Sequence, residues 1–274
     1  MMNALWKRVT LNIILVVFGV ITVMPFIWMI LSSFKTNAEI TSIIPTWWPE
    51  NFIFTNYTHI QSRFNFYRFF FNSLVISTIQ TAIIIYTSTI CGYVLAKYTF
   101  RGRGVLFGFI LGTMMIPGMV TIIPSYQLIV WLGWINNYAA IIVPGLISAF
   151  GVFMLRQSIM TVPNEIIEAA RIDGANEFYI LHNIIFPLSK NTISAIAIFQ
   201  FLWSWDSFLW PYLVIQTRSM QLLSVGLAMF QGQYATDYGG LFAATTISIM
   251  PVVIVYFIFQ KRFIDGVSSS AVKG

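Results

Sequence analysis

Charge and cysteine are both scarce in this sequence. Only 9% of its 274 residues are charged and 58% are hydrophobic, whereas a soluble domain carries about 25% charged residues. The one cysteine, Cys91, lies inside an apolar run, so no disulfide framework can form and redox chemistry is not indicated. The chain therefore has no room for a sizeable water-soluble domain, and its composition predicts an integral membrane protein.

Signatures of catalysis are also missing. There is no G-x-x-x-x-G-K-[ST] sequence that would cradle ATP phosphates. The two histidines, His59 and His182, are far apart in the sequence, and no His/Cys cluster has metal-ligand spacing. We therefore expect a non-catalytic subunit that holds no cofactor or metal of its own. A membrane enzyme remains an alternative, and it would form product in detergent without ATP.

Long apolar runs account for most of the chain. A helix needs about 20 apolar residues to cross a bilayer, and six runs reach this length, at about 10–33, 72–96, 104–130, 138–158, 191–214 and 240–260. Pro117 and Pro124 predict a kinked or broken third helix. The predicted fold is all-α, a single polytopic domain over residues 1–274 with six transmembrane helices.

The basic residues orient these spans. Of the fifteen Lys and Arg residues, eleven flank the spans on the side of the termini and of residues 97–103 and 156–190, and four lie on the opposite side. Cytoplasmic flanks carry the excess of Lys and Arg. We therefore expect both termini and the segment 161–190 in the cytoplasm. A net charge of +6 arranged in this way reflects membrane topology, not nucleic-acid binding.

The segment 161–190 is the one charged island, with four acidic residues, an Arg, a His and a Lys. Pro163 suits the first turn of a helix, and Gly174 provides a left-handed residue that stops it. A second short helix is predicted over about 175–186, and Pro187 marks the return to the membrane. The pattern predicts a helix-turn-helix elbow, which could equally be an ordinary helical loop.

The spacing within this elbow resembles the EAA signature of binding-protein-dependent ABC importer permeases. Glu168-Ala-Ala is followed by three residues, Gly174, nine residues and Ile184-Ile-Phe-Pro187. Phe186 stands where leucine is usual. The likeness extends over most of the chain and is closest to the carbohydrate-uptake group, in particular to the smaller six-span partner of maltose-type importers.

This resemblance implies a role for the elbow as a coupling helix that enters a cleft on a cytoplasmic ATPase subunit. The implied contacts are Glu168, Ala169, Ala170, Asp173, Gly174 and Pro187. It also implies a bacterial inner-membrane assembly with a second permease (a heterodimer), two ATP-binding subunits that hold ATP and Mg, and an extracytoplasmic solute-binding protein. The tail 271–274 is either a second ATPase contact or disordered.

The fifth run carries an unusual aromatic cluster around an acid. An ionisable residue at membrane depth usually faces a cavity or a partner, and family members more often have Asn at the position of Asp206. The aromatic rings could stack on sugars or simply pack between helices. The candidate pathway residues are Trp203, Trp205, Asp206 and Phe208.

The loop over residues 216–238 is longer than a connection between two spans requires. By resemblance it would contact the solute-binding protein, with Arg218, Gln231 and Tyr234 as candidates. The expected function is thus a permease subunit of an ABC importer for a sugar or oligosaccharide. The alternative is an ATP-independent secondary transporter or channel for a small polar solute, and the identity of the sugar stays open.

Overall fold

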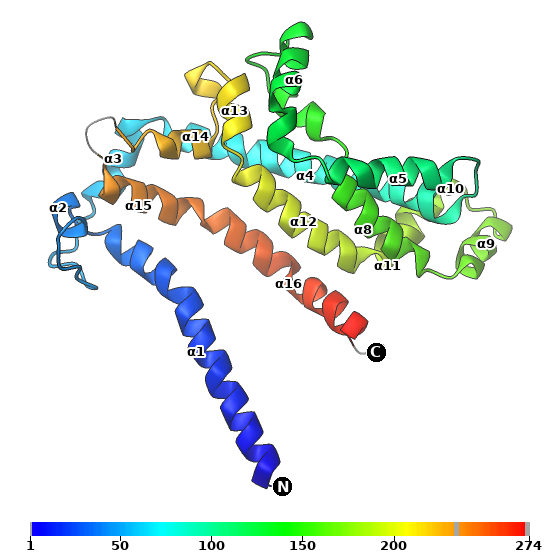
Figure 1. Cartoon of the computed structure of the whole chain (residues 1–274), viewed down its shortest axis with the longest axis horizontal. Coiled ribbons are helices and arrows are strands. Elements are labelled where there is room, and N and C mark those ends of the chain that lie inside the picture. Colours follow the sequence, from blue (N-terminus) through cyan, green and yellow to red (C-terminus); the bar gives the residue numbers. More distant parts are fainter. Residues whose placement is uncertain (1, 233–235, 272–274) are drawn as a thin grey trace. The chain divides into compact units, whose positions relative to one another are not determined.

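The computed structural model describes residues 2–232 and 236–271, and every regular element in these ranges is a helix (Figure 1). One isolated antiparallel bridge joins Gln231 to Thr236. The predicted all-α fold is confirmed. The chain forms two compact units, Met1–Tyr67 with Gly226–Met250, and Arg68–Val225 with Pro251–Gly274.

The first unit is built on four helices: α1 (Met2–Ser32), α2 (Asn37–Ile40), α3 (Thr55–Arg63) and α15 (Tyr238–Ser248). Helix α15 packs against α1, α2 and α3. Lys35, just after α1, is buried with its ammonium 4.6 Å from the Trp28 ring centroid, and it donates to Thr46. These contacts fold the loop after α1 back on the end of the helix.

The second unit contains the remaining helices. They are α4 (Phe66–Lys97, which begins in the first unit), α5 (Arg103–Met114), α6 (Gly118–Trp131), α7 (Ala139–Ile142), η1 (Val143–Gly145), α8 (Ala149–Met160), α9 (Asn164–Ile172), α10 (Glu177–Ile180), η2 (Leu181–Ile185), α11 (Phe186–Leu188), α12 (Lys190–Trp205), α13 (Leu209–Val214), η3 (Arg218–Met220), α14 (Leu223–Ala228) and α16 (Met250–Ala271). The η2 segment is a π-helical turn.

Four helical stretches in the described ranges are long and apolar enough to cross a membrane: Arg8–Ser32, Phe66–Lys97, Ala139–Met160 and Tyr238–Arg262. Two bent pairs raise the number to six if each pair is one span. The first pair, α5 and α6, bends by 101° just before Pro117, which confirms the predicted break in the third run. The second pair bends by 79° at Ser189, between the elbow and α12.

Close backbone contact between α4 and α8 holds the second unit together. A Cβ atom on Gly92 would lie 3.0 Å from the Leu155 Cβ, and one on Gly151 would lie 2.5 Å from the Ser88 hydroxyl. Small residues let membrane helices approach to this distance. Leu155 also belongs to an apolar cluster to which α4, α8, the elbow and α12 all contribute. The buried residues of this cluster are Tyr93, Leu155, Ile159, Ile167, Ile180, Leu181, Ile185 and Ile196.

Candidate functional site

The first limb of the elbow is α9, and Gly174 ends it. Gly174 has φ +86° and donates its N–H to the Arg171 carbonyl at 3.1 Å, while the Ala175 N–H donates to the Ala170 carbonyl at 2.9 Å. This pair of bonds is a Schellman motif, which requires a left-handed residue at the position of the glycine. Ala170 and Ala175 both pack on the apolar cluster. The predicted turn at Gly174 is confirmed.

Helix α9 has one buried and one exposed face. Ile167 is buried in the cluster at 2% exposure, whereas Glu168 and Ala169 are exposed, and Ile172 is 87% exposed. This exposed face carries an acid, a small residue and a large apolar side chain. The Glu168-Ala169-Ala170 sequence thus has two exposed residues and one, Ala170, that is half-buried against the apolar cluster.

The second limb starts at Asn176, whose side chain caps α10 by accepting the Tyr179 N–H at 2.8 Å. Ile180 and Ile185 are completely buried. The limb continues through the π-helical turn η2 into α11, where Pro187 is exposed just before the bend at Ser189. The two limbs therefore share one apolar base and leave their polar residues outside.

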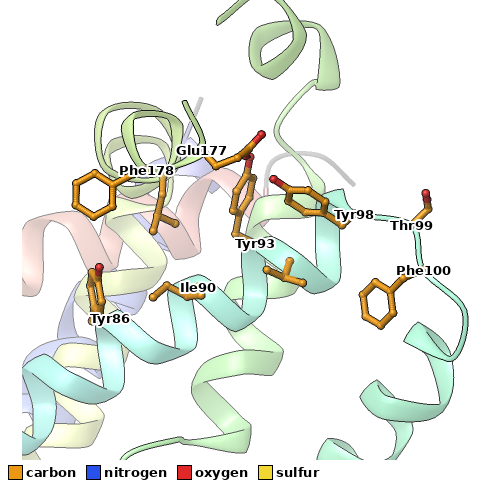
Figure 2. Close-up of a pocket in the computed structure, with 10 residues that line it drawn as sticks. Tyr86, Ile90, Tyr93, Tyr98, Thr99, Phe100, Glu177 and Phe178 are labelled. Carbon is orange, nitrogen blue, oxygen red and sulfur yellow. The ribbon is translucent and has the colours of Figure 1, made fainter. Parts of the chain in front are cut away.

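A hydrogen-bonded network attaches the elbow to the end of α4, and Figure 2 shows its Tyr93, Tyr98 and Glu177 side chains. The Glu177 carboxylate accepts a 2.7 Å bond from the Tyr93 hydroxyl through one oxygen and a 2.8 Å bond from Arg171 Nε through the other. Arg171 also donates to the Tyr98 hydroxyl at 3.4 Å, and its guanidinium lies 5.6 Å from that ring. A pocket of about 460 Å³ opens beside these residues. Both limbs are thereby joined to one membrane helix.

The charges of this network are mutually stabilised. Burial of the carboxyl opposes ionisation, yet hydrogen bonds from Arg171, Tyr98 and Tyr93 outweigh it and lower the pKa of Glu177 to about 2. The hydrogen bond to Glu177 raises the pKa of Arg171. The sequence did not single out these residues, because 84 positions separate Tyr93 from Glu177 and only the tertiary fold brings them together.

Lys97 attaches the start of the elbow to the same helix. It donates to the Val162 carbonyl and, at 2.8 Å, to the Asn164 side chain at the first position of α9. The end of α4 thus contacts the elbow at two places, the start of α9 through Lys97 and the start of α10 through Tyr93.

The turn between the limbs borders a hollow of about 500 Å³. Its lining includes Ala170, Asp173 and Gly174 from the first limb and turn, and Tyr179 and Asn183 from the second limb. Of the six residues expected to contact an ATPase, Ala170, Asp173 and Gly174 lie at this hollow, and Glu168, Ala169 and Pro187 are exposed elsewhere on the elbow.

The four candidate pathway residues lie at the end of α12 and in the break that follows it. Trp205 is buried, stacked on Phe201 with ring centroids 5.7 Å apart. Trp203 is 53% exposed, and Phe208 stacks on Tyr212 at 5.6 Å. Asp206 is the exposed C-cap of α12. Trp205 therefore serves helix packing, and Asp206 lies at a helix end and not within a helix.

The outer-loop candidates occupy different positions. Arg218 opens the η3 turn and is exposed, and Gln231 is exposed at the isolated bridge. Tyr234 lies outside the described residues. Within the first unit, Asp237 is the N-cap of α15, and its carboxylate accepts the Gly240 N–H at 3.1 Å. The same carboxylate forms an ion pair of 3.2 Å with Arg63.

The fold and the elbow define a polytopic helical membrane protein, and comparison with known proteins identifies its family. The model of the family described as "Binding-protein-dependent transport system inner membrane component" matches residues 88–269. The chain belongs to this family. It is an ABC importer permease, and its role in the importer is transport and not catalysis.

Individual relatives cover nearly the whole chain. The arabinooligosaccharides transport system permease protein AraQ of Bacillus subtilis is 34% identical over 97% of this chain and 96% of its own length. The diacetylchitobiose uptake system permease protein NgcG of Streptomyces coelicolor is 30% identical over 93% and 85%. A bacterial ABC transporter involved in the import of the acidic polysaccharide alginate has a chain of the same fold, with a TM-score of 0.81, 22% identity, and coverage of 94% and 96%.

Proposed function

We propose that this permease serves an importer for a sugar or oligosaccharide. Relatives named for arabinooligosaccharides, diacetylchitobiose and lactose support this substrate class. In the proposed assembly the chain is a single transmembrane domain paired with a second, different permease. An extracytoplasmic binding protein delivers the sugar, and two ATPase subunits hold ATP and Mg in the cytoplasm.

The elbow is the observation that carries the coupling role. Its inner face is held by Tyr93 and Lys97 of α4, and its outer face is open around the exposed Ile172. A movement of an ATPase subunit against this outer face would pass to α4 through hydrogen bonds and to α8 and α12 through the shared apolar cluster. We assign ATPase contact to Glu168, Ala169, Ala170, Asp173, Gly174 and Pro187, and the termini to the cytoplasm.

The other contacts follow from this orientation. Residues Arg218, Gln231 and Tyr234 would lie on the outer side, where the binding protein docks. Trp203, Asp206 and Phe208 would face the pathway near the end of α12, whereas Trp205 would support them from within the helix packing.

Reconstitution of the complete importer in proteoliposomes tests the proposal. We expect ATP-dependent sugar uptake that Glu168→Lys abolishes without loss of membrane insertion, because the reversed charge would lie at the ATPase contact. Glu50→Lys is the matched control, since Glu50 is also exposed but lies in the loop after α1, on the opposite predicted side. Uptake that persists without ATPase subunits would instead support a secondary transporter or channel and overturn the proposal.

A further inference from the structure

A pocket of about 320 Å³ lies within the second unit, and no elbow residue lines it. Its lining includes Gln80 of α4, Thr121 and Ser125 of α6, Gly145 of η1 and Trp210 of α13. Ligand pockets in proteins start at roughly 300 Å³ and combine apolar walls with a few placed polar groups. This pocket has both features, and its lining comes from four of the six apolar runs.

Gln80 is the most informative residue in the pocket. It sits near the middle of α4, where a polar side chain is costly unless it meets a partner or a water-filled cavity. Its amide oxygen accepts a 2.6 Å bond from the Ser204 hydroxyl, whereas its amide nitrogen has one long bond, 3.4 Å to the Ile141 carbonyl. A side-chain amide nitrogen has two donors, so a further donor is available to a ligand.

The surroundings hold this amide in place. A Cβ atom on Gly145 would lie 2.4 Å from the Gln80 amide nitrogen, so the amide occupies space that any other residue would fill. The Trp210 indole N–H donates to the Ala140 carbonyl at 2.8 Å, which fixes the ring beside the pocket. A preorganised amide next to a fixed aromatic ring can bind a ring-shaped ligand without first being ordered.

The chemistry of the lining defines the ligand class. Thr121 and Ser125 add hydroxyl groups that both donate and accept, Trp210 adds an apolar surface, and no lining residue is charged. Hydroxyl groups with an apolar ring face are features of a sugar, and a lining without a cation offers a carboxylate or phosphate no charged partner.

We infer that this pocket binds a neutral sugar residue of the transported substrate, with Gln80 and Trp210 as specificity-determining contacts. The inference rests on the proposed function and adds to it the uncharged nature of the sugar. It places the contact on α4, α6 and α13, beyond the aromatic residues at the end of α12.

Equilibrium dialysis on the complete importer tests this assignment, with ATP and a hydrolysis-inactive ATPase subunit present and the binding protein measured separately. The probes are radiolabelled arabinooligosaccharides, lactose and diacetylchitobiose as neutral sugars, and alginate oligosaccharides as acidic ones. We expect at least one neutral probe to bind and the acidic probe not to bind. Gln80→Leu should weaken neutral binding by roughly 2- to 10-fold, the effect of one lost hydrogen bond.

Gln127→Leu is the matched control, because Gln127 is an exposed glutamine of α6 outside the pocket, and we expect it to bind sugar as the wild type does. Trp210→Phe, which removes only the indole N–H and part of the ring, provides a second variant if Gln80→Leu fails to assemble. Equal binding by the pocket variant and the control, binding of no neutral probe, or equally tight binding of alginate oligosaccharides would overturn the assignment. Failure of ATP-dependent uptake by the wild-type importer would overturn the proposed function itself.

Discussion

The Tyr93 hydroxyl donates a 2.7 Å hydrogen bond to the Glu177 carboxylate, and this bond joins α4 to the second limb of the elbow. Tyr93 is 4% exposed, so its hydroxyl reaches the elbow from within the helix packing. Arg171 of the first limb binds the other oxygen of the same carboxylate. Glu177 is therefore the point at which both limbs and α4 meet.

Removing this connection should reduce coupling. We expect Glu177→Gln to retain membrane insertion and ATP hydrolysis while sugar uptake per ATP falls several-fold, because the ion pair and the charge-assisted bond are both lost. Discounted for the partial exposure of the carboxylate, the loss is about 1 kcal/mol. Uptake and hydrolysis measured together in proteoliposomes give the ratio. Tyr86→Phe, a hydroxyl deletion on the same helix, should leave the ratio unchanged.

The same carboxylate predicts a pH dependence. The pKa of Glu177 is lowered to about 2 from an ordinary value of 4.5, so its contribution to stability is complete above pH 4.5 and is lost as the pH falls toward 2. After correction for the intrinsic exchange rate, the protection of the elbow amides against hydrogen exchange should therefore be constant from neutral pH to about 5. Below pH 4.5 this protection should decrease. Glu177→Gln should remove this decrease, and an identical profile in the variant would contradict the assignment.

Gly174→Val should strain the elbow turn. Gly174 has φ +86°, which a β-branched residue adopts only at a cost of about 1–3 kcal/mol. No atom lies within 4 Å of the added Cβ, so the effect comes from the backbone and not from a clash. We expect the variant to insert in the membrane, and the importer assembled with it to hydrolyse ATP without transporting sugar. Gly174→Asn should retain much of the coupling because asparagine tolerates this conformation, and normal uptake by the valine variant would refute the role of the turn.

Gly92→Leu should separate α4 from α8. The backbone and Cβ of Leu155 and Arg156 lie 3.0–3.2 Å from the position of a Cβ atom on Gly92. Overpacking of this kind costs about 1–3 kcal/mol. Thermal unfolding of the detergent-solubilised protein measures the loss. Gly108→Leu on α5 is the control, since nothing lies within 4 Å of its Cβ position, and it should have a much smaller effect.

Asp206→Asn should leave stability unchanged or slightly raised. Asp206 is exposed and caps the C-terminal end of α12, where a negative charge opposes the helix dipole by a few tenths of a kcal/mol. Thermal unfolding tests this effect, and uptake of neutral and acidic sugars tests the pathway role. Unchanged uptake and selectivity would leave the residue with no transport role.

Local sequence signals were sufficient for much of the elbow. Gly174 marked the turn between the limbs, and the structure places it there with φ +86°. Pro117 likewise indicated the break between α5 and α6. These features depend on the backbone conformations that glycine and proline favour, so the residues at and near each position are enough to predict them.

Long-range contacts required the folded structure. Nothing in the local sequence distinguishes Glu177 from other acidic residues. In the fold, Tyr93 and Arg171 each donate a hydrogen bond to one of its carboxylate oxygens. Similarly, Gln80 belongs to an apolar run, and only the fold brings it within hydrogen-bond distance of Ser204 and into one pocket lining with Trp210. Composition made the aromatic residues at the end of α12 candidates for the pathway. The fold shows that one of them, Trp205, is buried between helices.

The sequence by itself thus determined the membrane character, the all-α class and the position of the elbow, because composition, helix length and turn chemistry are local. The tertiary structure alone decided which polar residues meet. A hydrogen bond between side chains more than eighty residues apart depends on helix packing, and no spacing along the chain specifies it. The attachment of the elbow to α4 through Glu177, and the pocket around Gln80, both belong to this second category.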